Sequence, residues 1–89
     1  MDPAHLPNRS EELRDEQQVL LKAQVDIEEG WNRVRDQQDL LTCLRNEGKQ
    51  TREAERLLHL FRRTLVEWER HRILIEQRVA YLEKGSSGA

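Results

Sequence analysis

The chain has few of the residue types that build sheets or cross-linked folds. Of its 89 residues 4% are aromatic, and it holds one cysteine, two prolines and four glycines. The single Cys43 excludes an internal disulfide. Charged and hydrophobic residues each make up 36% of the chain, a balance that favours long amphipathic helices. The composition therefore predicts an all-α fold.

Long apolar runs and a strong net charge are also missing. No stretch approaches the roughly 20 consecutive apolar residues of a membrane-spanning helix. The first five residues lack the basic start and apolar run of a secretory signal. A formal net charge of −2 disfavours a dedicated nucleic-acid binder, which is usually strongly basic. We therefore expect a cytoplasmic protein with no membrane association.

The clearest pattern is a stripe in the C-terminal half whose spacing alternates between four and three residues. It consists of Ala54, Leu58, Phe61, Leu65, Trp68, Arg72, Ile75, Val79 and Leu82. Only Arg72 in this stripe is not apolar. Such spacing is typical of the a and d positions of a helix that packs against another helix.

The N-terminal half carries a weaker stripe at seven-residue intervals. Its members are Leu13, Leu20, Ile27, Val34 and Leu41. Three residues beyond each of them the chain has Glu16, Ala23, Gly30, Gln37 and Leu44. Because most of these companion residues are small or polar, this helix is expected to form the poorer side of a coiled-coil seam.

Capping signals divide the chain into two helices, at 10–47 and 51–84. Asn8 or Ser10 is suited to cap the first helix, and Gly48 to stop it, while Thr51 is suited to cap the second. The short connection at 48–51 favours antiparallel neighbours, so we predict a two-helix hairpin with coiled-coil packing. Residues 1–9 read as a flexible arm and residues 85–89 as a flexible tail.

Folding the chain about Lys49 predicts which seam residues meet. Leu41 is placed opposite Leu58, Val34 opposite Leu65, and Leu20 opposite Val79, while Gly30 lies near Trp68. A glycine within a helix costs roughly 0.5 to 1 kcal/mol relative to alanine. We expect room for the Trp68 indole to offset this cost, although Gly30 is also readable as a tolerated kink.

The second helix has more apolar surface than one partner helix can cover. The apolar residues outside its seam include Leu57, Leu60, Val66, Ile73, Leu74 and Tyr81. Exposed apolar patches of this kind mark interaction surfaces. We therefore expect two hairpins to pair into a homodimeric four-helix bundle. The alternative is a hairpin that offers this surface to a different protein.

Arg72 interrupts the seam opposite Ile27 and has two interpretations. A single charge at such a position can set register when it is paired with Asp26, Glu28 or Glu29. The more ordinary interpretation, which we favour, is that the apolar stem covers the interface while the guanidinium reaches water.

Signatures of chemistry are weak throughout the chain. Di-metal bundles place a glutamate three residues before a histidine, but Arg56 and Trp68 precede His59 and His71 at that distance. Glu67 and His71 are four residues apart and are better read as a surface pair than as half a metal site. No phosphate-binding loop or exposed nucleophile turn is present. The sequence predicts a non-enzymatic protein without metal or cofactor.

Arginines on the outer face of the second helix leave one further alternative open. Arg52, Arg56, Arg63 and Arg70 could contact phosphate or an acidic partner. Glutamates are interleaved with them, so a solvated face with ion pairs inside the helix is the commoner explanation. Nucleic-acid binding therefore stays a minor alternative.

The middle of the chain resembles a known group of sequences. The pattern is Gly30-x-x-Arg33-Val34-x-x-Gln37-x-x-Leu40-Leu41-x-x-Leu44, then Gly48-x-x-Thr51-x-x-Ala54-x-x-Leu57-Leu58-x-x-Phe61-x-x-Thr64-Leu65, and finally His71-Arg72. It resembles short, uncharacterised helical proteins of rhizobia and related alphaproteobacteria over roughly residues 26–72. The resemblance implies a bacterial, cytoplasmic hairpin and carries no activity.

Overall fold

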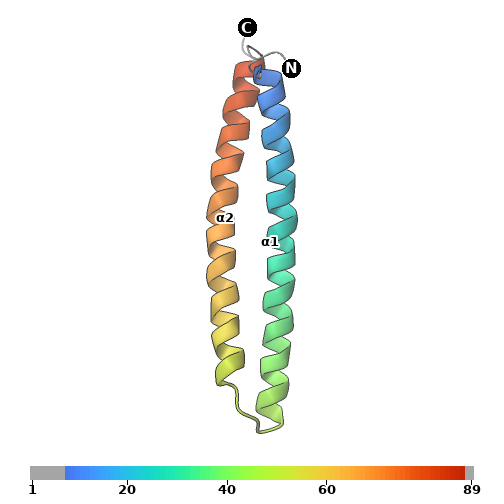
Figure 1. The fold of residues 1–89 in the computed structure, drawn as a ribbon, viewed down its shortest axis with the longest axis vertical. Helices are drawn as coiled ribbons and strands as arrows, with labels where there is room; N and C mark the ends of the chain where they lie inside the picture. The colour runs from blue at the N-terminus through green and yellow to red at the C-terminus, as the bar shows by residue number, and fades with distance from the viewer. Residues whose placement is uncertain (1–7, 88–89) are drawn as a thin grey trace, which may run out of the picture.

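The computed structural model describes residues 8–87 and consists of two antiparallel helices. Helix α1 spans Arg9–Asn46 and helix α2 spans Arg52–Ser87 (Figure 1). The predicted all-α hairpin is confirmed. Neither of the described helices is long and apolar enough to cross a membrane.

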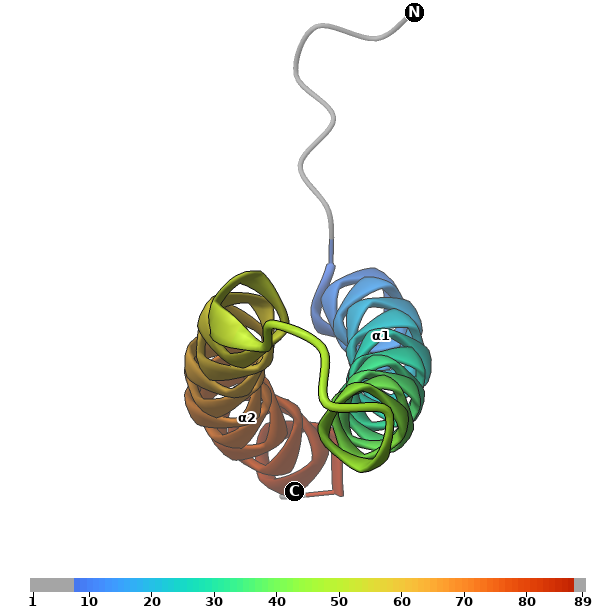
Figure 2. The same ribbon diagram turned by 90° about the horizontal axis from the view of Figure 1, so that it is seen from below.

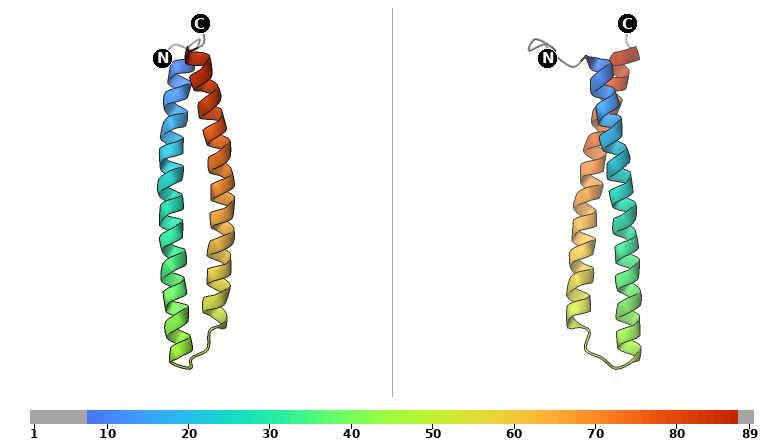
Figure 3. Two further views of the ribbon diagram at one scale, coloured as in Figure 1. Left: turned by 180° about the vertical axis from the view of Figure 1, so that it is seen from behind. Right: turned by 45° about the vertical axis from the view of Figure 1, so that its right-hand side comes forward.

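The helices lie side by side along their whole length and twist around one another. Figure 3 shows the two helices side by side from the connection to the other end, and the end view in Figure 2 shows the twist. At 1.5 Å per residue, the 38 residues of α1 make the hairpin about 57 Å long. A thin, extended molecule of this shape exposes most of its side chains.

Helix α1 begins at Arg9, so the predicted arm at 1–9 is wrong at its last two residues. Asn8 is the N-cap, and its side-chain oxygen accepts a hydrogen bond from the Glu11 backbone N–H at 2.8 Å. This bond satisfies one of the unpaired amides at the start of the helix. Residues 1–7 of the predicted arm lie outside the described part of the chain.

The connection begins with a glycine cap of the Schellman type. Gly48 has a φ of 67°, which is the left-handed conformation that glycine adopts without a Cβ penalty. The Gly48 N–H donates to the Arg45 carbonyl at 3.1 Å, and the Lys49 N–H donates to the Leu44 carbonyl at 2.9 Å. These are the two bonds that define the motif, so Gly48 ends α1 as its sequence position predicts.

Thr51 directly precedes α2, and its hydroxyl makes a side-chain bond. The carbonyl of Thr51 accepts the Glu55 N–H at 2.9 Å, which starts the helix. Its hydroxyl donates to the Glu55 carboxylate at 3.3 Å. Glu55 also pairs with Arg45 at 3.2 Å, so this carboxylate ties the start of α2 to the end of α1.

Helix α2 continues to Ser87, so the predicted flexible tail at 85–89 is wrong over 85–87. The Arg9 guanidinium lies in the space that a side chain at Gly85 would fill. It also lies over the Tyr81 ring, 5.6 Å from the ring centre. A cation near the C-terminal end of a helix stabilises its last turns. Residues 88–89 lie outside the described part.

The core is one narrow seam between the helices. Its buried apolar residues are Ile27, Val34, Leu41, Ala54, Leu58, Leu65, Ile75, Val79 and Leu82. The partly buried seam residues are Leu13, Leu20, Leu44, Phe61 and Trp68. Every member of both predicted apolar stripes is thus buried or partly buried.

Candidate interaction surface

All six residues of the predicted interaction surface are exposed. Their exposed fractions are 43% for Leu57, 54% for Leu60, 47% for Val66, 49% for Ile73, 63% for Leu74 and 64% for Tyr81. The hairpin partner therefore leaves about half of each side chain in solvent. This surface is the strongest candidate for a functional site on the molecule.

These residues form two groups on opposite sides of the seam. Leu60, Leu74 and Tyr81 each directly precede a seam residue, whereas Val66 and Ile73 each directly follow one. Because successive residues are about 100° apart around a helix, the two groups lie on different flanks of α2. We call them the Leu60 face and the Val66 face.

The Leu60 face has the pattern of a second seam. It alternates three- and four-residue steps through Leu57, Leu60, Thr64, Glu67, His71, Leu74, Arg78 and Tyr81. The apolar residues stand toward both ends of this stripe, Thr64, Glu67 and His71 occupy the middle, and Arg78 separates Leu74 from Tyr81. Such a stripe beside the first one is what a helix in a four-helix bundle requires.

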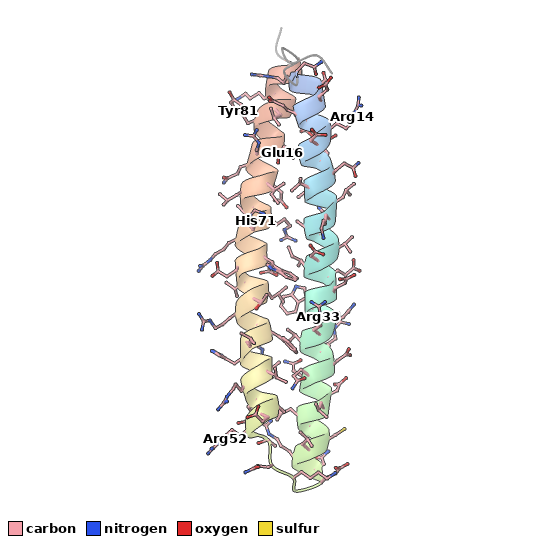
Figure 4. The ribbon with its side chains drawn as sticks, viewed as in Figure 1. Arg14, Glu16, Arg33, Arg52, His71 and Tyr81 are labelled. Atoms are coloured by element: carbon pink, nitrogen blue, oxygen red, sulfur yellow. The ribbon has the colours of Figure 1, made fainter. Side chains whose placement is uncertain are left out.

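Grooves run along the Leu60 face on both sides of Trp68. One, of about 320 Å³, is lined by Leu60, Phe61 and Trp68 from α2 and by Gly30 and Arg33 from α1. The other, of about 220 Å³, is lined by Trp68, His71 and Ile75 together with Val19, Ala23 and Asp26, among others. Figure 4 places Arg33 and His71 near mid-length on the two helices, which locates these grooves.

Helix α1 also contributes exposed apolar residues, which the sequence reasoning missed. Val19 and Leu40 are 45% and 47% exposed. Each directly precedes a stripe residue, Leu20 or Leu41, and Val19 lines a groove of the Leu60 face. Testing the positions next to each stripe for further apolar residues would have found them.

The flank that carries the Val66 face is bridged by bonds within the hairpin. The Trp31 indole N–H donates to the Glu69 carboxylate at 3.2 Å, beside Val66. The Arg45–Glu55 ion pair closes the same flank near the connection.

The Leu60 face is bridged as well, because Arg78 pairs with Glu16 at 2.9 Å and Arg9 lies over the Tyr81 ring. Bonds across the hairpin therefore do not separate the two faces, and the Leu60 face is preferred because it carries four of the six exposed apolar residues.

Two seam positions of α1 that are not apolar, Gln37 and Gly30, have direct structural roles. Gln37 is buried, and its amide donates to the Ala54 carbonyl at 3.1 Å. Gly30 leaves room for the predicted neighbour Trp68 and also for Leu65, which was not predicted. A Cβ added at Gly30 would lie 3.7 Å from Trp68 and 3.0 Å from Leu65 Cδ1. The Gly30–Trp68 approach is thus present, with Leu65 as the nearer neighbour.

Arg72 is held by its own helix. Its Nε atom lies 3.4 Å from Glu76 Oε1, within ion-pair distance but without hydrogen-bond geometry. The suggested partners Asp26, Glu28 and Glu29 do not pair with it; Asp26 instead pairs with Lys22 at 3.2 Å. Arg72 is half-buried, and its Nε is buried without a hydrogen-bond partner in the described part of the chain, so the favoured interpretation, in which the guanidinium reaches water, is wrong for this atom.

The polar residues considered for chemistry lie apart or in surface ion pairs. Glu67 pairs with Arg70 at 3.2 Å, and Arg56 lies 3.7 Å from Glu53. Arg52 points away from α1 near the connection (Figure 4). Within residues 8–87 no group of three or more histidine, cysteine or acidic side chains is placed to hold a metal ion.

Comparison with known proteins adds no relative. No family model, curated protein or solved structure matches the chain. The resemblance to short rhizobial helical proteins therefore stays a prediction. Any function must be argued from the hairpin itself.

Proposed function

We propose that this protein is a non-enzymatic interaction module that self-associates through the exposed apolar residues of α2. The observation that carries the proposal is the exposure of six large apolar residues on one helix, at 43% to 64% each. Exposed apolar area on this scale is costly in water, and pairing of two hairpins removes part of it. The expected assembly is a homodimeric four-helix bundle.

Two other functions remain as alternatives to self-association. The same surface would suit a different helical protein, which would make the chain an adaptor or regulator. Arginine-mediated nucleic-acid binding is the weaker alternative, because Arg56 and Arg70 already lie beside glutamates. A cytoplasmic location, expected from the sequence, stays part of this proposal.

Light scattering over a dilution series tests the proposal. A dimer gives about twice the 10.6 kDa mass of one chain and dissociates on dilution. A strict monomer at all concentrations would refute self-association and favour the adaptor. Retention on DNA or RNA that weakens with salt would favour nucleic-acid binding, because phosphate contacts release counterions.

A matched pair of substitutions locates the contact. Leu74→Glu places a charge on a residue that is 63% exposed in the hairpin, so it should leave the helix intact and block pairing. Val25→Glu changes a residue that is 50% exposed on α1 and serves as the control. Equal effects of the two variants on molar mass would show that α2 is not the contact.

A further inference from the structure

We infer that two copies pair through their Leu60 faces in an antiparallel arrangement, with the two-fold axis passing near Gly30 and Trp68. This inference rests on the self-association proposed above and specifies its geometry. The axis would lie across the hairpin, so that the connection of one copy lies beside the chain ends of the other. Helix α1 then faces α1 of the partner, and α2 faces α2.

The apolar residues of the Leu60 face are placed symmetrically about this point. On α2, Leu57 and Tyr81 lie nearly equally far from Trp68 on its two sides, as do Leu60 and Leu74. Reversing one copy about Trp68 therefore brings Leu57 within two residues of the level of Tyr81 of the other, and Leu60 within two residues of the level of Leu74. An isologous interface requires this self-complementarity.

Helix α1 shows the same symmetry about Gly30. Val19 lies eleven residues before Gly30 and Leu40 ten residues after it, so reversal brings these two exposed side chains together. Gly30 itself packs against Leu65 and Trp68, so the centres of symmetry on the two helices coincide in space. The spacing of exposed apolar residues on α1 and the spacing on α2 thus indicate the same two-fold axis.

Charged residues beside the axis fit the same arrangement. Asp26 lies four residues before Gly30 and Arg33 three residues after it, and they line the two grooves on either side of Trp68. Arg33 makes no ion pair with any residue in the described range 8–87. Antiparallel pairing places Asp26 of one copy level with Arg33 of the other, twice per dimer.

A parallel dimer would place no carboxylate level with Arg33, and the nearest one on the Leu60 face, Glu67, is a turn away and already pairs with Arg70. In that arrangement residues at the same level meet, and Arg33 would lie opposite Thr64, with which it lines a groove within its own hairpin. The net charge of the whole helices favours the parallel arrangement. Helix α1 has nine acidic and six basic residues and α2 has six acidic and eight basic, so parallel pairing joins helices of opposite sign, whereas antiparallel pairing joins helices of like sign. The inference therefore rests on the placement of individual side chains about the axis.

The native cysteine permits a direct distance measurement. Cys43 is exposed and lies thirteen residues from Gly30, or about 20 Å along α1. Spin labels on Cys43 should therefore be about 40 Å apart in the antiparallel dimer, measured by pulsed dipolar spectroscopy. In a parallel dimer both labels lie at the connection, within about 20 Å, since packed helices are 8–10 Å apart.

The outcomes separate the inference from the proposed function. A distance near 40 Å supports the antiparallel dimer. A distance below about 20 Å in a chain that light scattering shows to be dimeric would overturn the antiparallel arrangement and leave self-association standing. A monomeric chain would overturn both. The labelled and unlabelled proteins must give the same molar mass.

Charge reversal provides a second test. Arg33→Glu and Asp26→Arg should each raise the dimer dissociation constant about tenfold, because each creates two repulsive contacts per dimer. An equimolar mixture of the two variants should recover wild-type affinity as a heterodimer. Glu28→Arg is the control, since Glu28 directly follows Ile27 and lies on the other flank of α1. Failure of the mixture to recover affinity would contradict the Asp26–Arg33 contact.

The choice of face is tested by paired substitutions. Leu60→Glu with Leu74→Glu should abolish pairing, whereas Val66→Glu with Ile73→Glu should leave the dissociation constant within about threefold of wild type. All four residues are exposed, so both variants should keep the hairpin, as circular dichroism can verify. The reverse result would move the interface to the Val66 face.

Discussion

The two ends of the hairpin are built differently. Near the connection, both helices supply buried residues, and Ile27, Val34, Leu41, Ala54, Leu58 and Leu65 form one continuous cluster. Toward the chain ends, α2 still buries Ile75, Val79 and Leu82, but α1 buries no residue between Arg9 and Asp26. The helix with the weaker stripe thus determines where the core is complete.

The difference has a local cause in α1. Its companion positions toward the chain ends are Glu16 and Ala23, which cannot fill the seam as Leu44 does near the connection. Peripheral contacts take over there, with Arg78 and Glu16 paired at 2.9 Å and Arg9 lying over Tyr81. Exposed ion pairs contribute only about 0 to 1 kcal/mol each, so the connection end should carry most of the stability.

Matched leucine truncations give the largest expected contrast. Leu65→Ala should lower the free energy of unfolding by about 3 kcal/mol, because Leu65 is buried and contacts Gly30. Leu20→Ala removes the same atoms from a half-buried site and should cost about 1 kcal/mol. Urea unfolding at one fixed protein concentration measures both. Equal losses would remove the difference between the two ends.

Trp68→Ala tests the boundary between the connection end and the chain-end half of the hairpin. The indole is half-buried beside Gly30, so we expect a loss of about 2 kcal/mol, below the 3 to 5 kcal/mol of a fully buried tryptophan. Fluorescence of the remaining Trp31 can follow the unfolding. A loss below about 0.5 kcal/mol would mean that the ring only covers the surface.

Gln37→Met isolates the polar contact at the connection end. Methionine keeps a similar volume but cannot donate to the Ala54 carbonyl, so we expect a loss of about 1 kcal/mol in urea unfolding. Gln38→Met, one residue further along α1, is the control for helix propensity. A neutral or stabilising result at Gln37 would show that the bond fixes register without adding stability.

Gly30→Ala should have the smallest effect. Alanine gains about 1 kcal/mol of helix propensity, and its Cβ would lie 3.0 Å from the flexible end of Leu65, which must shift slightly. These terms nearly cancel, so the unfolding free energy should change by less than about 0.5 kcal/mol. A loss above about 2 kcal/mol would show that Leu65 and Trp68 cannot yield, and would make Gly30 a rigid part of the core.

The sequence was sufficient to predict the hairpin because its two stripes and its glycine stop act locally. Spacing alone identified the seam, and the same spacing left six apolar residues without cover. The same spacing divides them between two flanks of α2, but which α1 residues line the grooves beside them depends on the register between the helices. The Gln37 bond to Ala54 depends on the register between the helices, and so does the placement of the Arg9 side chain beside Gly85.

The return of α2 beside the start of α1 has a practical consequence. Arg9 and Gly85 are neighbours, while Gly48 lies a full helix length away (Figure 1). A donor fluorophore fused ahead of the hairpin and an acceptor fused behind it would therefore report efficient energy transfer when the chain is folded. In the antiparallel dimer, the two copies would place these attachment points at opposite extremities. The dimer would therefore suit use as a rigid spacer between two fused proteins.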